Sequence, residues 1–288
     1  MTAQPTRIVD AHVHLWDPAR TDWYPYLSHP PAGGRGDASR MHRRFDVGIY
    51  RTETARWNVE RFINVAAATG PHSVEETLEL DRDALARGGP DAIIGGLPPA
   101  DTVAESVEFI DRQMTASRFR GVRPMGGLDQ PLPDVEVLRA LQERNLVFEL
   151  MTHPDQLRSS AAGLAGFDDL TVVVEHTGWP RSSSEEEHML WRGGIDALAD
   201  LGDNVVCKLS GLAMPFESMH ADALGPWLEY AIEAFGVDRC LFASNFPVDA
   251  VYGTFDELYT TFSEVTVGLD DASREKLFAG NAERVYRL

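Results

Sequence analysis

The stretch IVDAHVHLWD, residues 8–17, has the β-branched, apolar start and the polar end that are typical of a buried β-strand. Alternate side chains of an extended strand leave on the same face, so His12 and His14 are expected to point one way. Ala11 and Val13 are expected to point the other way. Two imidazoles on one face can bind a single ion or a single substrate. The alternative interpretation is that both rings only form hydrogen bonds with the backbone at the end of the strand.

Seven more apolar, β-rich runs follow this one, and segments with helical periodicity separate them. The strands are expected at 7–14, 61–68, 91–97, 119–125, 145–151, 171–176, 204–210 and 239–245. The helices are expected at 73–89, 100–118, 134–145, 185–202 and 223–236. The first helix begins with Ser73 and has Glu76 three residues later, which predicts a capping box.

The alternation of these segments predicts the fold. Strands that are apolar throughout and alternate with helices indicate a parallel sheet covered by helices. Eight such units in 288 residues fit a single-domain (β/α)8 barrel. A doubly wound open sheet is the alternative, and it is disfavoured because no GxGxxG or GxxxxGK[ST] pattern follows a strand. Residues 15–60 form one long segment rich in proline, glycine and aromatic residues, which we expect to pack over the active-site end.

Composition narrows the classes of partner. The formal net charge of −19 disfavours nucleic acids and anionic membranes, which are normally bound by basic surfaces. The sequence has no apolar run long enough to span a membrane, and its first residues do not resemble a secretory signal. We therefore expect a cytoplasmic protein that acts on a small molecule, with homo-oligomers left open. Cys207 and Cys240 lie in apolar runs and are expected to be buried, reduced thiols.

Polar residues gather where the expected strands end, and in an α/β barrel the reacting groups come from these ends. They are His12, His14, Arg123, Glu149, His153, Glu175, His176, Lys208, Ser210, Ser244, Asn245 and Asp249. The remaining histidines, in loops or charged helices, are expected to be solvent-exposed and without function. They are His29, His42, His72, His188 and His220.

Several of these residues have two interpretations. Lys208 interrupts an apolar strand and needs either a carboxylate partner, for which Glu149 and Glu175 are candidates, or a ligand. Arg123 either neutralises a neighbouring acid or clamps a substrate carboxylate. His153 precedes a proline, so it either begins a helix or contacts the substrate.

The histidines suggest two kinds of chemistry. Two or three neutral imidazoles and an oxygen ligand can hold zinc or a similar ion with one position open for water, whose pKa then falls to about 7. The same cluster without an ion could polarise a carbonyl group through imidazole and guanidinium donors.

Five motifs in order carry a family resemblance: DAHVHLWD, RGVR, EHTGWP, CKLSGL and CLFASNFPVD. From about residue 7 to the final NAERVYRL, the sequence resembles the amidohydrolase superfamily. Within it, the sequence is most similar to the lactonase-like branch, which includes L-fuconolactonase, L-rhamnonolactonase and 2-pyrone-4,6-dicarboxylate lactonase. The resemblance implies a (β/α)8 barrel, opening of a lactone or similar ester, and a metal requirement that varies within the branch.

Carried over to this sequence, the resemblance marks His12, His14 and His176 as the set that binds a metal or a carbonyl group. It marks Arg123 and Lys208 as positive charges of the active site, and we add His153 as a third candidate for substrate binding. The FRGVRPM strand has no lysine where binuclear relatives form a bridging carbamate, so one ion, most simply zinc, or none is expected.

The sequence departs from many relatives at the eighth strand, where SNFP stands in place of SDWP. In those relatives the aspartate takes a proton from the attacking water, whereas the amide of Asn245 is not a base at neutral pH. The base is therefore unassigned among Asp249, Glu149 and His176, and Asn245 is expected to orient water or substrate.

The leading hypothesis is a hydrolase that opens a sugar-acid lactone or a carboxylated lactone from aromatic breakdown. A decarboxylase of the same superfamily is an alternative, which the missing aspartate disfavours because those relatives also use one. A ligand-binding relative without catalysis is the third hypothesis, and it too follows from the asparagine.

Overall fold

The structure is a computed structural model that describes residues 4–27, 36–126 and 131–288, so His29 lies outside the described residues. Eight parallel strands pair in sequence order. The first and eighth strands meet where Val13 pairs with Phe246 and where the Asn245 amide donates to the His12 carbonyl at 2.9 Å. The strands are β1 Ile8–Val13, β2 Val59–Val65, β3 Ala92–Leu97, β4 Phe119–Pro124, β5 Val147–Leu150, β6 Val172–Val174, β7 Val205–Leu209 and β8 Cys240–Phe242.

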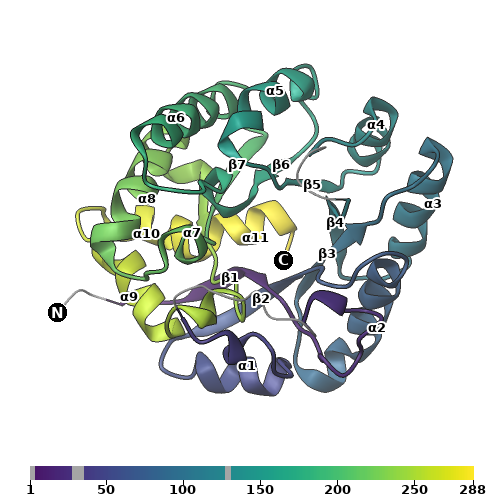
Figure 1. The fold of residues 1–288 in the computed structure, drawn as a ribbon, viewed down its shortest axis with the longest axis horizontal. Helices are drawn as coiled ribbons and strands as arrows, with labels where there is room; N and C mark the ends of the chain where they lie inside the picture. The colour runs from purple at the N-terminus through teal and green to yellow at the C-terminus, as the bar shows by residue number, and fades with distance from the viewer. Residues whose placement is uncertain (1–3, 28–35, 127–130) are drawn as a thin grey trace.

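Helices surround this barrel and form its outer layer (Figure 1). They are α1 Val47–Glu53, α2 His72–Arg87, α3 Val103–Gln113, α4 Val135–Glu143, α5 Pro154–Leu164, α6 Glu185–Ala199, α7 Ala213–Phe216, α8 Ala221–Phe235, α9 Phe255–Val265, α10 Asp271–Glu275 and α11 Asn281–Tyr286. The predicted (β/α)8 barrel is confirmed. Within the described ranges, no helix is long and apolar enough to cross a membrane.

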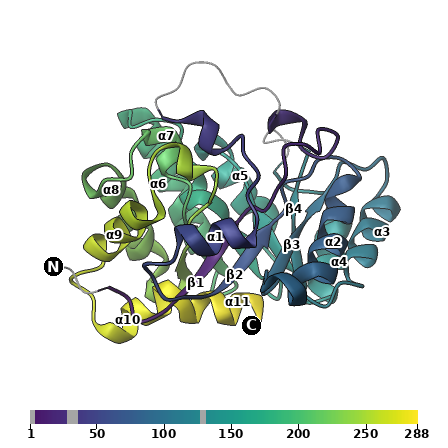
Figure 2. The ribbon, with the colours of Figure 1, turned by 90° about the horizontal axis from the view of Figure 1, so that it is seen from below.

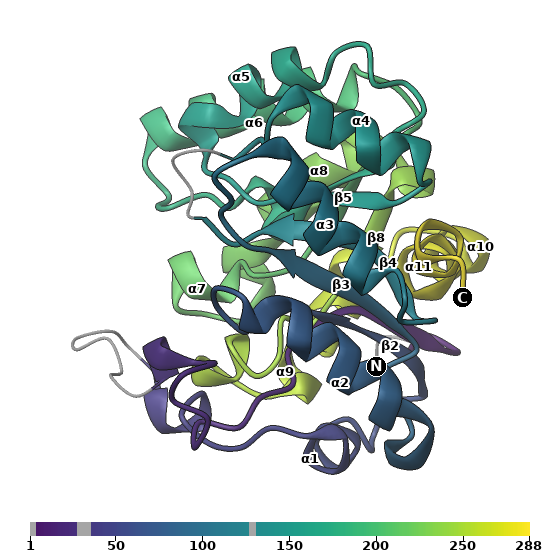
Figure 3. The same ribbon diagram turned by 90° about the vertical axis from the view of Figure 1, so that its right-hand side faces the viewer.

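Apolar side chains of the strands fill the barrel together with α11, which lies inside the ring of helices in Figure 1. Figures 2 and 3 place α11 at the end opposite the segment that follows β1. This inner cluster consists of Val9, Ala11, Ile63, Val65, Ala92, Ile94, Val147, Val173, Val206, Leu241, Ala243, Ala279, Ala282, Val285 and Tyr286. The bottom of the barrel is therefore closed by apolar packing, which leaves the carboxyl ends of the strands for polar side chains.

Strand β1 does not alternate as the sequence predicts. Ala11 belongs to the inner cluster, whereas Val13 belongs to the core between the strands and the helices. The pairing of β1 with β2 shifts register between Asp10 and Val13, so the simple alternation fails there. The prediction that Ala11 and Val13 share a face is wrong, but His12 and His14 do converge.

The predicted capping box of α2 is also wrong. Ser73 lies inside the helix, and Pro71 occupies the cap position without a side-chain hydrogen bond. The Glu76 carboxylate instead accepts hydrogen bonds from the backbone N–H groups of Ala67 and Ala68 and from the Tyr24 hydroxyl. Glu76 therefore fastens the loop after β2 to the segment after β1.

The described part of residues 15–60 is ordered by aromatic packing. Trp16, Trp23 and Tyr24 are buried, and the Trp16 ring stacks on His14 with centroids 5.7 Å apart. The Tyr26 hydroxyl donates to the Ala67 carbonyl at 2.9 Å. These contacts hold the described part of this segment next to the ends of β1 and β2, while residues 28–35 lie outside the described ranges.

Candidate active site

Three histidines meet at the carboxyl ends of β1 and β6. The Nε2 atoms of His12 and His14 are 3.1 Å apart, and the rings of His12 and His176 have centroids 4.7 Å apart. All three side chains are almost fully buried. The structure thus brings together the three residues that the resemblance assigns to metal or carbonyl binding.

Burial keeps these imidazoles neutral. It lowers the pKa of His12 and His14 well below the usual range, and the positive charges of Lys208 and Arg123 act in the same direction. The same causes lower the pKa of His176 to about 3. Neutral imidazoles offer lone pairs, so the cluster is suited to bind an ion or a polar group at neutral pH.

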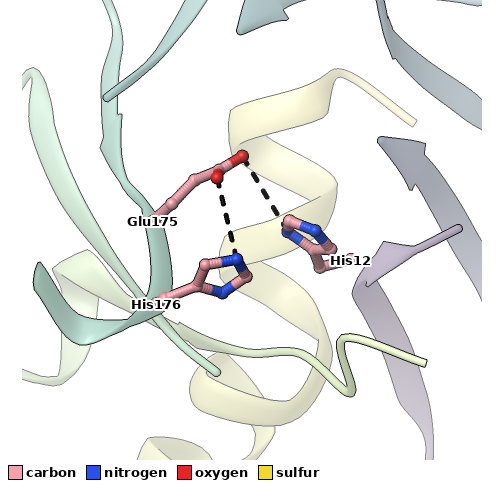
Figure 4. A group of neighbouring side chains, drawn as sticks. All are labelled: His12, Glu175 and His176. Atoms are coloured by element: carbon pink, nitrogen blue, oxygen red, sulfur yellow. Dashed lines mark ion pairs between the residues drawn. The ribbon is translucent and has the colours of Figure 1, made fainter. Parts of the chain in front are cut away.

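The acid Glu175 lies between two of the histidines (Figure 4). Its Oε1 atom is 4.0 Å from His12 Nδ1, and its Oε2 atom is 3.8 Å from His176 Nε2. The candidate ligand atoms of His12, Glu175 and His176 all lie within 4.8 Å of one another. This cluster contains Glu175 in place of His14, which the resemblance assigns to the metal or carbonyl set. His14 contacts His12 at Nε2, whereas Glu175 lies near His12 Nδ1.

Arg123 neutralises Glu175. Its Nη1 atom is 3.4 Å from Glu175 Oε2, and its Nη2 atom donates to the Ala66 carbonyl at 2.6 Å. Burial alone would raise the pKa of Glu175, but the charge of Arg123, a hydrogen bond with Glu149 and the charge of Lys208 together hold it below the usual range. The interpretation of Arg123 as a partner of a neighbouring acid is the one the structure supports.

Lys208 has the carboxylate partner that its burial requires. Its ammonium group donates to both oxygens of Glu149 at 2.7 Å and lies 3.4 Å from His12 Nδ1. The Tyr286 hydroxyl of α11 donates to Glu149 Oε1 at 2.6 Å. Tyr286 could not be predicted from the sequence, because no motif marks it and its partner lies 137 residues earlier.

These neighbours favour one tautomer for each histidine of β1. His14 Nδ1 is 2.8 Å from the Val65 carbonyl, which can only accept, so this nitrogen carries the proton. The Lys208 ammonium can only donate, so His12 Nδ1 accepts and His12 Nε2 carries the proton towards His14 Nε2. A chain of hydrogen bonds thus runs from Glu149 to the backbone of β2.

A left-handed turn after β6 aims His176 into the site. His176 and Thr177 have φ angles of 52° and 56°, and Trp191 Nε1 holds the turn by donating to the Thr177 carbonyl at 2.6 Å. His176 Nδ1 is 3.0 Å from the Ser210 hydroxyl oxygen. Gly211 packs so closely that a Cβ atom there would lie 2.5 Å from the His176 ring.

Gly211→Ala is therefore expected to displace His176. Gly211 has a φ of +68°, so an alanine would add backbone strain to the steric conflict, together about 1–3 kcal/mol. Thermal unfolding should show this loss, while Gly268→Ala, an exposed position with no atom within 4 Å of the new Cβ, should leave stability nearly unchanged. Equal stability of both variants would contradict the packing role of Gly211.

Asn245 and Asp249 form a buried pair beyond the end of β8. Asn245 Nδ2 donates to Asp249 Oδ1 at 2.8 Å, and the Asp249 backbone amide donates to the Asn245 carbonyl at 3.1 Å. Burial raises the pKa of Asp249 to about 8. The Ser244 hydroxyl, one residue earlier, donates to the His12 carbonyl at 3.3 Å.

The other predicted residues lie as follows. His153 caps α5, and its Nδ1 atom is 3.0 Å from the Trp179 carbonyl oxygen, so the prediction that a helix begins here is confirmed. Cys207 and Cys240 are buried, free thiols. The prediction of exposure holds for His220 but is wrong for three histidines that are half-buried, two of them by stacking on tryptophans: His42, His72 and His188.

The chain belongs to the amidohydrolase family, whose profile matches residues 9–288. It is 26% identical over 294 residues to an L-fucono-1,5-lactonase of Burkholderia ambifaria, covering 97% of this chain and 95% of that protein. It is 30% identical to the uncharacterized protein y4mH of Sinorhizobium fredii, covering 98% of both chains.

Among solved structures, an amidohydrolase of Burkholderia multivorans with bound zinc superimposes with a TM-score of 0.81. The two sequences are 25% identical, and the match covers 98% of this chain and 100% of that one. The predicted resemblance to the lactonase-like branch is thus confirmed.

Proposed function

We propose that this amidohydrolase opens a small lactone, either a sugar-acid lactone or a carboxylated ring lactone, by attack of water on the ring carbonyl. The observation that carries the proposal is the convergence of three buried, neutral imidazoles at the mouth of the barrel. The likeness to an L-fucono-1,5-lactonase supports the choice of a cyclic ester.

The residues present fit a single divalent ion. The candidate ligand atoms of His12, Glu175 and His176 all lie within 4.8 Å of one another, close enough to hold one tetrahedral ion. Glu175 Oε1 is buried and has no hydrogen-bond partner among the described residues, as expected of an atom available to a ligand. His12 and His176, with Glu175 as the oxygen donor, would hold the ion, while His14 would orient the His12 ring through its Nε2 atom. Zinc suits these ligands.

When bound, such an ion supplies a Lewis acid for the carbonyl oxygen and lowers the pKa of a bound water to about 7. The side chains of the protein bind the substrate and position the histidines. We assign to Arg123, which is 9% exposed and also pairs with Glu175, and to His153 the role of holding the anionic or hydroxylated part of the substrate. Lys208 is fully buried on Glu149, so we assign it to holding His12 rather than to touching the substrate.

A pH-indicator screen of sugar lactones and carboxylated lactones tests the proposal. We expect acid release by the wild type, with metal content measured in parallel, and a loss of about 100-fold or more in His12→Ala and His176→Ala. The exposed His220→Ala serves as the control. Unchanged turnover in both site variants would contradict the proposal, release of carbon dioxide would indicate a decarboxylase, and tight binding without turnover would indicate a binding protein.

A further inference from the structure

The Asn245 and Asp249 pair leaves two acceptor atoms unused. Asn245 Oδ1 and Asp249 Oδ2 are buried, and neither has a hydrogen-bond partner in the described ranges of the chain. Buried polar atoms are normally satisfied, so two such oxygens in one bonded pair point to a ligand that donates hydrogen bonds. Water, with two donor hydrogens, is the smallest ligand that does so.

One short segment connects this pair with His176. Ser210 and Gly211, at the end of β7, contact the His176 ring. Two residues further on, the Ala213 backbone N–H lies close enough to Asp249 to lower its pKa, and Met214 Sδ lies 3.9 Å from Asn245 Nδ2. Residues 210–214 therefore contact both the His176 imidazole and the pair of Asn245 and Asp249.

The pair is also fixed to β1. The Asn245 backbone amide donates to the His12 carbonyl at 2.9 Å, and Asn245 adopts a left-handed φ of 56°. Asparagine tolerates this conformation better than most residues. Asn245 thus turns the chain after β8 and brings a carboxyl group four residues later back against its own amide.

We propose that Asp249 is the base of the reaction, with the attacking water held between Asp249 Oδ2 and Asn245 Oδ1. This assignment rests on the proposed function. The water oxygen bonds to the lactone carbonyl carbon as one of its protons passes to Asp249. The bond from that carbon to the ring oxygen then breaks, Asp249 returns the proton to this oxygen, and the hydroxy acid formed releases a proton to solvent.

The surroundings of Asp249 contain few other titrating groups. Burial raises the pKa of the Tyr252 hydroxyl, and the charges of Asp249 and Glu217 raise it further. The 3₁₀ segment Ala38–Arg40 packs on the segment Asp249–Val251; it ends with Arg40, and Asp37 directly precedes it. Burial is the leading cause of the raised pKa, so Asp249 becomes a base as pH rises through about 8.

The test compares Asp249→Asn with Asp203→Asn, an exposed control. Asp249→Asn keeps the hydrogen bond from Asn245 but removes the base, so kcat should fall about 100-fold or more with KM changed less than threefold. The wild type should show kcat/KM rising with pH through about 8, and this limb should vanish in Asp249→Asn. The double variant Asn245→Asp with Asp249→Asn, which exchanges acid and amide, should recover at least tenfold of the loss.

A kcat within threefold of wild type in Asp249→Asn, or a pH limb that persists in it, would overturn the assignment. Should Asp249→Asn fail to fold, the double variant Asn245→Asp with Asp249→Asn tests the role of the pair instead. Activity within tenfold of wild type supports a base in this pair, and its absence from a folded double variant overturns it. A wild type that opens no lactone contradicts the proposed function, whereas normal turnover in Asp249→Asn contradicts only the role of Asp249.

Discussion

Glu149→Gln is expected to lower the free energy of unfolding by about 3–5 kcal/mol, because it removes the carboxylate that hydrogen-bonds the buried Lys208 ammonium. Both side chains are fully buried, and their atoms are 2.7 Å apart. Glutamine keeps an oxygen that can accept from Tyr286, so the loss reports mainly the missing charge. Urea unfolding of the variant and of wild type measures the difference.

Two further variants make this prediction specific. Glu143→Gln, at an exposed position of α4, should change the free energy of unfolding by no more than about 0.5 kcal/mol. Lys208→Met added to Glu149→Gln should recover most of the loss, because no unpaired charge then remains inside the barrel. If Glu149→Gln were as stable as Glu143→Gln, Lys208 would not be a charged group that depends on Glu149.

His176 is expected to make the metal-free protein sensitive to acid. Its pKa is about 3 in the folded chain, against 6.5 for an unperturbed histidine. As pH falls below 6.5, the unfolded chain takes up a proton that the folded chain does not, so stability falls. Between neutral pH and about pH 5 this single group should lower the free energy of unfolding by about 2 kcal/mol.

Chelator-treated wild type and His176→Gln should therefore show unfolding free energies that diverge in their pH dependence, with the variant losing less over this range. His220→Gln, at an exposed site, should follow the wild type. Parallel curves for wild type and His176→Gln would mean that His176 is protonated as easily in the folded protein as in the unfolded chain. His12 and His14 add to the same trend, because burial lowers the pKa of both.

The sequence predicts the strands well because each is an apolar run between helical segments. All eight observed strands overlap their predicted ranges. The sixth strand was predicted to include Glu175 and His176, but it ends before them, because the chain leaves β6 through a left-handed turn. Hydrophobic periodicity carries no signal for such a turn, so it predicts that His176 follows β6 but not how the ring is aimed.

Among the helices that were not predicted are α5 and α9. Segment α5, Pro154–Leu164, is rich in serine, alanine and glycine. Segment α9, Phe255–Val265, has a clear apolar face at Phe255, Leu258, Tyr259 and Phe262 and a capping box at Thr254, so its pattern was overlooked rather than weak. The capping box at Ser73 failed because Glu76 has stronger partners in the backbone of the loop after β2. A tertiary contact here overrides a local pattern that is favourable by itself.

The site residues that sequence reasoning identified are those at strand ends, because parallel strands place their carboxyl ends together. The contacts between them could not be predicted in the same way. Both Glu149 and Glu175 were candidates for the Lys208 partner, and only the geometry assigns Glu149 to Lys208 and Glu175 to Arg123. Tyr286 was missed because its contribution depends on α11 entering the barrel.

The position of α11 sets an order of events during synthesis. A ribosome delivers all eight strands before residues 281–286, yet the hydroxyl that bonds Glu149 beside Lys208 and His12 belongs to this late segment. A nascent chain can therefore pair its strands before α11 covers the end of the barrel, while the charged groups of Glu149 and Lys208 are still hydrated. The Tyr286 contact with Glu149 can form only when α11 docks, so this part of the buried network is completed after the strands that carry its other members have been synthesised.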